Sequence, residues 1–344
     1  EYHEGQVTLT PAKGGEKLES VQTLRELLAD PGGIFFSGKL KVTFSPVDPA
    51  IADLSKVNEQ IQALRSLRLG GTVYDPITDE IIPWNISQKT LDSWIIVQKE
   101  GDVNYSVSLN RESLKEYLAG LTRKIDLGKG RFIEPIQHPE AVGEQMLQGG
   151  QPMLIARHAP GEFVAEGGES MLGVAWQTGI PMWRIIQANP GVNQRWIPAG
   201  TRLALPSKDD LLPLPVILNK RIVISISEQR MWVYQDRQSL REFVISTGIA
   251  DSPTQPGVYQ VQTHEINAYA ENWDLWMPHW LGIYEAWPGF MNGIHGLPML
   301  SNGVRLWKNV LGSPASYGCI ILDLPEAEWL YGWAENGVVV EIRR

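Results

Sequence analysis

The sequence predicts a multidomain protein with an α+β N-terminal domain, a small β-α-α-β module and a mostly antiparallel β domain. Strand-like and helix-like segments alternate up to about residue 158, a compact strand-helix-helix-strand string follows, and strand signals dominate from about residue 217. At 344 residues the chain is long enough for two or three cores. We therefore expect domains at 1–158, 160–207 and 217–344.

In the first domain, a strand precedes a helix twice. Period-2 alternation predicts strands at 39–44 and 105–109, and apolar residues at helical spacing predict helices at 53–67 and 110–125. Asn110 is placed to cap the second helix. The zone does not gather a nucleophile, a base and glycines, so the sequence favours a binding or spacer module.

The segment 162–206 begins and ends with strand-like runs that flank two short helices. The first helix is predicted to start after Ser170 and to stop at Gly179. The second carries Pro181 in its first turn, where the missing N–H costs nothing, and ends near Asn189. Of the aromatic residues here, we expect Trp176 and Trp183 to pack in the module's core.

Composition limits the possible partners. The formal net charge of −9, with no basic block, argues against nucleic acid, and the absence of a ~20-residue apolar run argues against membrane insertion. A chain with one cysteine cannot form an intrachain disulfide. Its six histidines are scattered and do not have the sequence spacing that is typical of zinc ligands. The chain opens at "EYHEGQ", without Met or a signal-type stretch, as a processed product would.

The single cysteine, Cys319, lies in the β-rich domain. A thiol becomes nucleophilic when a histidine lowers its pKa or accepts its proton, and the domain offers His264, His279 and His295. Gly318 frees the backbone beside it, so amides between Tyr317 and Cys319 are candidates for an oxyanion hole. An inert buried cysteine is the alternative.

Residues 219–344 resemble the L,D-transpeptidase (YkuD) catalytic domain. The runs "ISISEQRMWVY", "FVISTG", "PTQPG", "IHG", "SYGCI" and "NGVVVEI" occur in the family's order. The resemblance implies a β-sandwich and a cysteine acyl-enzyme that forms on a peptidoglycan stem peptide. It implies that Cys319 is the nucleophile, that His295 is its base or ion-pair partner, and that the Gly296 carbonyl orients the imidazole.

The remaining motif residues implied for the site are Ser316, Tyr317 and Gly318. The family usually has His where this chain has Tyr317, and Asn or Arg where it has Ile321. A phenol keeps its proton at neutral pH, so Tyr317 is not expected to act as a base. The 20 residues between His295 and Ser316 include "LSNGVRLWKN", a candidate flap.

Four tryptophans, at 273, 276, 280 and 287, precede the histidine motif. Such density is a candidate lining for a donor cleft, but we expect core packing for most of them.

Residues 160–207 resemble a LysM module, through the Gly-Glu-Ser turn, "TGIPMWRIIQAN" and "IPAGTRLALP". The resemblance implies binding of N-acetylglucosamine-containing glycans through two loops, with Gly168, Glu169, Ser170, Asn189 and Pro190. The stretches "PWNISQKTLDSW" and "VSLNRESLKEYLAGLTRKID" resemble a peptidoglycan-binding domain that often precedes such catalytic domains.

Together these resemblances imply an exported acyltransferase of the cell wall or a secreted one, which cross-links peptidoglycan or attaches groups to it, and contributes to wall biogenesis and cell shape. We expect that an export signal or anchor has been removed. Its partners are stem peptides and glycan strands, and its chemistry needs no metal or organic cofactor. Two alternatives stay open: a catalytically silent wall-binding protein, and a cysteine L,D-carboxypeptidase that passes the acyl group to water.

Overall fold

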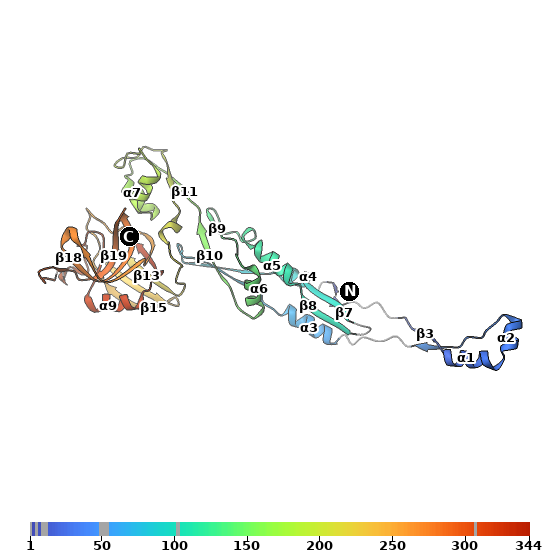
Figure 1. Ribbon diagram of the computed structural model, residues 1–344. Coiled ribbons are helices and arrows are strands. Elements are labelled where there is room, and N and C mark those ends of the chain that lie inside the picture. The colour runs from blue at the N-terminus through green and yellow to red at the C-terminus, as the bar shows by residue number, and fades with distance from the viewer. Residues whose placement is uncertain (1, 4–5, 8–12, 48–54, 101–103, 306–307) are drawn as a thin grey trace. The chain divides into compact units, whose positions relative to one another are not determined.

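The computed structural model describes residues 2–3, 6–7, 13–47, 55–100, 104–305 and 308–344 (Figure 1). The chain divides into two compact units. One contains Glu1–Thr72, Pro83–Ile125 and Pro135–Met153, and the other contains Val73–Ile82, Asp126–Glu134 and Leu154–Arg344. The second unit thus includes two short segments, 73–82 and 126–134, that lie inside the predicted N-terminal domain.

The first unit contains small hairpins and helices. Its elements are β1 (Tyr2–His3), β2 (Gln6–Val7), β3 (Gly15–Leu18), α1 (Ser20–Ala29), α2 (Pro31–Ser37), β4 (Phe44–Val47), α3 (Ser55–Arg65), α4 (Gln88–Ser93), β7 (Ile95–Glu100), β8 (Asn104–Leu109), α5 (Arg111–Ala119), η1 (Leu121–Arg123) and α6 (Pro139–Leu147). The predicted strand at 39–44 is wrong, because the strand β4 begins at Phe44 and pairs with β3.

The helix predicted over 53–67 is present as α3, and residues 53 and 54 lie outside the described part of the chain. Val57 and Ile61 of α3 are buried against Ile95 of the β7–β8 hairpin. Asn110 caps α5 as expected, since its side chain accepts a hydrogen bond from the Ser113 amide at 3.1 Å. Gly120 ends α5, so the helix predicted over 110–125 is shorter and is followed by η1.

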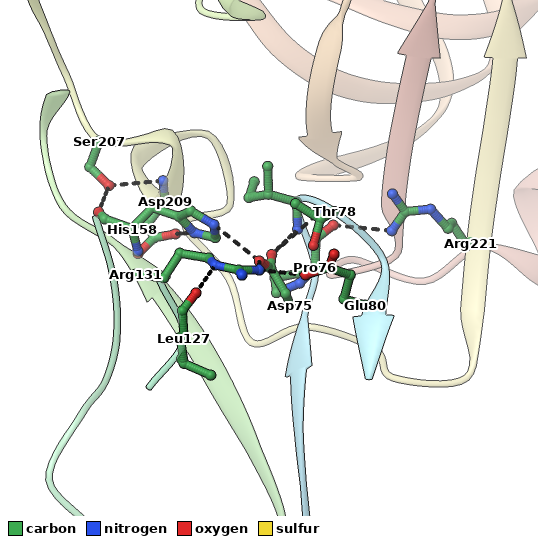
Figure 2. A network of polar contacts seen from close by, with 11 residues as sticks. Asp75, Pro76, Thr78, Glu80, Leu127, Arg131, His158, Ser207, Asp209 and Arg221 are labelled. Carbon is green, nitrogen blue, oxygen red and sulfur yellow. Dashed lines mark hydrogen bonds and ion pairs between the residues drawn. The ribbon is translucent and has the colours of Figure 1, made fainter. Parts of the chain in front are cut away.

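A four-stranded sheet has the order β6-β5-β10-β9, formed by β5 (Gly70–Asp75), β6 (Glu80–Asn85), β9 (Arg131–Ile133) and β10 (Met153–His158). Asp75, whose side chain is fully buried, lies at the end of β5 (Figure 2). Its carboxylate accepts from Arg131 Nη1 at 3.1 Å and lies 3.3 Å from His158 Nε2. His158 Nδ1 lies 3.1 Å from Asp209 Oδ1, so the imidazole lies between two carboxylates.

The module predicted at 160–207 has the expected β-α-α-β order, with β11 (Gly161–Val164), α7 (Met171–Thr178), α8 (Met182–Ala188) and β12 (Arg202–Leu205). The Ser170 side chain accepts from the Gly173 amide at 3.1 Å, and Gly179 ends α7 in the left-handed conformation at φ +70. Pro181 is the N-cap of α8 and not part of its first turn. A short 3₁₀ turn, η2 (Lys208–Leu211), follows.

The β domain contains two sheets, of orders β15-β14-β13-β22-β16 and β17-β18-β19-β21, with β20 beside β18. The elements are β13 (Lys220–Ser225), β14 (Arg230–Gln235), β15 (Gln238–Val244), β16 (Gly257–Gln260), β17 (Thr263–Ala270), η3 (Glu271–Trp273), β18 (Leu275–Trp287), β19 (Phe290–Gly296), β20 (Met299–Leu300), η4 (Lys308–Val310), β21 (Ile320–Leu322), α9 (Leu324–Trp333) and β22 (Val339–Arg343). Only β13–β22 and β19–β21 are parallel among these pairs. The predicted β-rich character is confirmed.

The main core of this domain is built from both sheets and α9. Ile222 and Val340 of the first sheet, Ile283 and Ile294 of the second, and Leu330 of α9 belong to the same buried cluster. Residues that alternate with these along β19 point to the opposite face, where the candidate site lies. In the described ranges, no helix is both long and apolar enough to cross a membrane.

Candidate active site

The parallel pairing of β19 with β21 brings the predicted nucleophile and base to one face of the sheet. His295 is the register partner of Ile321, and Cys319 lies two residues before Ile321. Side chains two residues apart on an extended chain point the same way, so Cys319 lies on the face that carries His295. Both side chains line the same cleft.

The loop that carries Cys319 is fixed by its own polar groups. Ser316 Oγ donates to the Cys319 carbonyl at 2.6 Å and accepts from the Gly318 amide at 3.1 Å. Thr254 Oγ1 donates to the Gly318 carbonyl at 2.9 Å. Gly318 has φ +113, and a Cβ there would lie 2.5 Å from the Asn292 amide nitrogen. Glycine is therefore required here by both backbone and space.

The backbone amides expected to form the oxyanion hole differ in whether they already donate a hydrogen bond. The Gly318 amide is used by Ser316. Within the described ranges, no hydrogen bond uses the amide of Tyr317 or that of Cys319. These two N–H groups remain the candidates for stabilising an oxyanion.

The thiol of Cys319 contacts a buried polar pair that the sequence analysis missed. Cys319 Sγ lies 3.9 Å from Asn292 Oδ1, and Asn292 Nδ2 donates to Tyr284 Oη at 3.0 Å. Asn292 and Tyr284 are both almost fully buried. An asparagine inside the apolar alternation of β19 was the available signal, because a buried amide needs a partner. Burial of the sulfur raises the pKa of Cys319 to about 11, although the residue as a whole is half-buried.

The imidazole of His295 is buried, with 3% of the residue exposed. Burial lowers the pKa of His295 to about 4, so the ring is neutral at pH 7. Nδ1 lies 2.7 Å from the Gly296 carbonyl oxygen, which can only accept, so Nδ1 carries the hydrogen and Nε2 is the basic nitrogen. Trp280 stacks on the ring with centroids 5.8 Å apart.

The cleft is lined mainly by apolar and aromatic side chains: Ala270, Trp273, Leu275, Met277, Trp280, Phe290, Met291, His295, Pro298, Ser316, Tyr317, Cys319 and Ile321. Tyr317 is 51% exposed, and its ring stacks on Trp273 at 6.1 Å between centroids. Trp273 also packs against Phe290 at 5.5 Å. Ile321 is buried, and its backbone exchanges two hydrogen bonds with Ser246.

The expectation that most of the four tryptophans are core residues is wrong. Trp280 is the only buried one, and it lines the cleft together with the partly exposed Trp273. Trp276 packs beside Tyr269, and Trp287 is 47% exposed. Alternate residues of β18, such as Leu275 and Met277, line the cleft, because side chains of a strand point to opposite faces in turn.

The other two candidate histidines lie elsewhere. His264 contacts Asn336 Oδ1 through Nδ1 at 2.9 Å and the Tyr331 carbonyl through Nε2 at 3.2 Å. His279 packs against Tyr331 at 5.6 Å between centroids. Neither lines the cleft around Cys319. Pro298, which lies just before the predicted flap, lines the cleft, and residues 306 and 307 of the flap lie outside the described ranges.

Three of the residues expected to bind glycan in the module, Glu169, Ser170 and Asn189, make hydrogen bonds that hold its turns and helices. The Glu169 carboxylate accepts from the amides of Glu166 and Gly167, both at 2.8 Å. Ser170 caps α7, and Asn189 Nδ2 donates to the carbonyls of Ile185 and Ala204. Gly168 has φ +89 in the same turn as Glu169, and Pro190 is exposed after α8.

Trp176 and Trp183 do not belong to the module's buried core, so that expectation is wrong. Trp183 Nε1 donates to the Glu285 carbonyl of β18 at 2.8 Å. The Arg344 guanidinium lies over Trp176 at 5.6 Å. Both rings therefore pack where the module meets the β domain.

No group of three or more His, Cys, Asp and Glu side chains with metal-binding geometry occurs among the described residues.

One family of known proteins matches the β domain of this chain. Residues 219–342 match the family model for the L,D-transpeptidase catalytic domain, YkuD. The Bacillus subtilis (strain 168) protein YciB, whose name assigns it to the L,D-transpeptidases, is 24% identical over 123 residues. That alignment covers 32% of this chain and 58% of YciB, so the chain spans less than two thirds of this relative.

Two solved structures illustrate the range of structural matches. An L,D-transpeptidase from Enterococcus faecium is 19% identical, with 82% of this chain and 97% of that chain covered and a TM-score of 0.36. One from Mycobacterium tuberculosis H37Rv is 19% identical, with 43% of this chain and 64% of that chain covered and a TM-score of 0.31. The range that is similar to the YkuD family of L,D-transpeptidase catalytic domains, residues 219–342, includes both His295 and Cys319.

Proposed function

We propose that the protein is an L,D-transpeptidase that acts on peptidoglycan stem peptides through an acyl-enzyme on Cys319. The observation that carries the proposal is the register of β19 and β21, which lines one cleft with the only cysteine of the chain and a buried histidine. The family match of residues 219–342 supports the same reaction class.

The protonation states favour one of the two roles considered for His295. With the thiol pKa raised to about 11 and the imidazole pKa lowered to about 4, both groups are neutral at pH 7 in the resting enzyme. Proton transfer during attack is therefore favoured over a preformed thiolate–imidazolium pair. The Gly296 carbonyl holds the hydrogen on Nδ1 and leaves the Nε2 lone pair for the thiol proton.

In the proposed first half-reaction, Cys319 Sγ forms a bond to the donor carbonyl carbon while His295 Nε2 accepts the thiol proton. The amides of Tyr317 and Cys319 stabilise the oxyanion. The C–N bond to the terminal D-Ala breaks, and its amine takes the proton from Nε2. In the second half-reaction, an amine of a neighbouring stem attacks the thioester and Cys319 leaves as the thiol.

The apolar and aromatic cleft supports binding of a peptide rather than of a highly charged ligand. We also propose that residues 160–207 form a LysM module that binds glycan strands, and that the first unit is a peptidoglycan-binding domain. These assignments imply a site of action outside the cytoplasm. Glycan binding is tested by titrating chito-oligosaccharides into the full chain: Pro190→Lys should weaken binding, and Pro160→Lys should not.

Intact mass spectrometry tests the catalytic proposal. We expect the protein to gain one adduct after incubation with a carbapenem, or with a tetrapeptide donor, and Cys319→Ala to gain none. Wild-type protein that stays unmodified by both reagents contradicts the proposal and favours the silent wall-binding alternative. Product analysis with the donor then separates transfer, which joins two stems, from hydrolysis, which releases a free tripeptide.

A further inference from the structure

Trp280 covers one face of the proposed base. Its ring stacks on the His295 imidazole, with 5.8 Å between the centroids and 21° between the planes. The two residues lie side by side on neighbouring strands, because Leu281 of β18 is the register partner of Ile294 of β19. Both are buried. An indole therefore lies directly over the ring that is proposed to accept the thiol proton.

The Trp280 ring is held in a socket that two glycines leave open. A Cβ at Gly293 would lie 2.7 Å from the ring, and a Cβ at Gly282 would lie 3.1 Å from Nε1. Trp280 Nε1 donates to Thr263 Oγ1 at 3.3 Å, and Thr263 is the register partner of Gly282. The position of the indole is therefore fixed by the shape of the sheet and by a hydrogen bond.

Regular alternation along β18 does not account for the place of Trp280. Leu275 and Met277 line the cleft, so alternation would put His279 on the cleft face and Trp280 on the other face. The structure has the reverse, since Trp280 lines the cleft and His279 packs against Tyr331 of α9. The change of face occurs at His279, whose φ is +57.

The backbone of His279 is unusual for its position. Among the described residues, the other non-glycine residues with positive φ lie in turns, whereas His279 lies inside β18. Its Nδ1 is buried and has no hydrogen-bond partner in that part of the chain, so no contact of this nitrogen explains the backbone. Strained backbone of this kind is kept mainly at functional sites. Here the strained residue turns the next side chain, Trp280, toward His295.

Charged side chains do not set the protonation of His295. Among the described residues, no Asp, Glu, Lys or Arg lines the cleft, where the other titratable groups are Cys319 and Tyr317. On the side of α9, Leu324 and Ala327 are the residues that approach the end of β19. The exclusion of water is therefore the main influence on the charge of the ring.

Burial lowers the pKa of His295 from an ordinary value of 6.5 to about 4, and the Gly296 carbonyl opposes this shift. The face of an indole also attracts an imidazolium, but the low pKa reflects desolvation as the larger effect. Glu265, the register partner of Trp280 on β17, is exposed to solvent. A side chain that keeps water from the imidazole thus also keeps it uncharged.

We propose that Trp280 is a positioning residue for His295: it shields the imidazole from water and holds it in the neutral form that accepts the thiol proton. His279 supports this role through its backbone, by turning Trp280 to the cleft face, and its own imidazole takes no part in the chemistry. The inference rests on the proposed transpeptidase function, because a neutral ring matters for catalysis only if His295 takes the proton of Cys319.

The first measurement is the pKa of His295 in variants of the full chain. Histidine rings labelled with ¹⁵N are titrated by NMR between about pH 4.5 and pH 8, and the signal missing from His295→Gln identifies the residue. We expect Trp280→Ala to admit water and to move the pKa from about 4 toward 6.5. Trp280→Phe, which keeps a ring over the imidazole, should stay close to the wild type. Trp287→Ala, the same change at an exposed position of β18, is the matched control.

The second measurement is the pH dependence of Cys319 acylation by a carbapenem. A histidine with a pKa of 6.5 is only about one tenth neutral at pH 5.5, so Trp280→Ala should react about tenfold more slowly at pH 5.5 than at pH 8. The wild type, Trp280→Phe and Trp287→Ala should differ by less than about twofold between these pH values. Purely structural damage would lower both rates alike and leave their ratio unchanged.

Two substitutions at His279 test how Trp280 reaches the cleft. Glycine adopts a φ of +57 without strain, so His279→Gly should keep the wild-type pKa of His295. A β-branched residue strongly disfavours this φ, so His279→Val should raise the pKa as Trp280→Ala does. A wild-type pKa in His279→Val contradicts the role of His279.

An unchanged pKa of His295 in Trp280→Ala overturns the proposal. If that variant does not fold, Trp280→Leu takes its place, with Trp287→Leu as its control. A wild type that gains no adduct on Cys319, together with a raised pKa of His295 in the Trp280 variant, contradicts the proposed function and leaves the shielding of the imidazole established.

Discussion

Two histidines of the second unit, His158 and His295, are both largely buried and have opposite electrostatic surroundings. The His158 ring lies between Asp209, 3.1 Å from Nδ1, and Asp75, 3.3 Å from Nε2 (Figure 2). These carboxylates, Asp209 first, raise the pKa of His158 to about 9. His295 faces a backbone carbonyl and Trp280, and burial lowers its pKa to about 4.

Burial alone does not fix the charge of a histidine. Two carboxylates offset the cost of burying an imidazolium at His158, so the ring is a cation that ties β10 to β5 and to η2. Among the described residues no acid pairs with His295, so the same burial keeps its ring neutral, which is the form that accepts a proton. The first histidine is expected to stabilise the structure, and the second is expected to take part in chemistry.

The largest expected effect is on acylation. His295→Ala should reduce the rate of Cys319 acylation by a factor on the order of 10²–10⁴, the range for positioned acid–base groups. His158→Gln should leave the rate within about threefold, because it does not line the cleft. Stopped-flow or mass-resolved acylation by a carbapenem measures both. His264→Ala and His279→Ala are the controls, and greater damage from either one would refute the assignment of the base.

Removal of the negative charge of Asp75, which lies between Arg131 and His158, should have a large effect on stability. Asp75→Asn leaves two cations beside a neutral amide, and we expect it to lower the free energy of unfolding by about 3 kcal/mol. The side chain of Asp75 is fully buried, so solvent does not compensate for the loss. Denaturant unfolding followed by tryptophan fluorescence gives the value, with Asp236→Asn as the exposed control. A loss equal to that of the control would show that the network contributes little.

The pH dependence of stability should separate the two histidines by sign. The pKa of His158 is raised from 6.5 to about 9, so its contribution is complete below pH 6.5 and is lost as pH rises to 9. The pKa of His295 is lowered, so the unfolded state takes up more protons between pH 6.5 and 4, and His295 costs stability as pH falls there. His158→Gln should therefore destabilise by roughly 2 kcal/mol at pH 6 and little at pH 10.

His295→Gln should flatten the acid side of the same stability profile. Unfolding midpoints from pH 4 to pH 10 for the wild type and both variants provide the measurement. Parallel profiles for the two variants would contradict the opposite charge states.

The smallest expected effect concerns Tyr317. Its ring stacks on Trp273, and among the described residues no hydrogen bond uses its hydroxyl group. Tyr317→Phe keeps the stack and should change acylation by less than about threefold. Tyr317→His, which restores the common family residue, should also stay active. Tyr317→Ala should lose the ring contact, worth about 0.5–1.5 kcal/mol. If Cys319 stays unmodified in the wild type but gains an adduct in Tyr317→His, the tyrosine silences the site.

Local features were the ones that could be predicted from the sequence. The caps at Asn110, Ser170 and Gly179 depend on hydrogen bonds and backbone angles within a few residues, and the structure has them. The order of the sequence motifs also predicts Cys319 and His295 as candidate site residues. The failed strand at 39–44 shows the limit, because short period-2 patterns carry no information about pairing partners.

Which groups meet, and in which charge state, depends on contacts between distant parts of the chain. Asp75 and Arg131 are 56 residues apart, and His158 and Asp209 are 51 apart, so no local pattern connects them. Asn292 was missed beside Cys319 for the same reason. The local caps and the motifs that contain the thiol and the imidazole could be predicted without any tertiary contact. Folding determined that His158 is charged and His295 neutral, because a pKa depends on the solvent and charges that the fold places around the group.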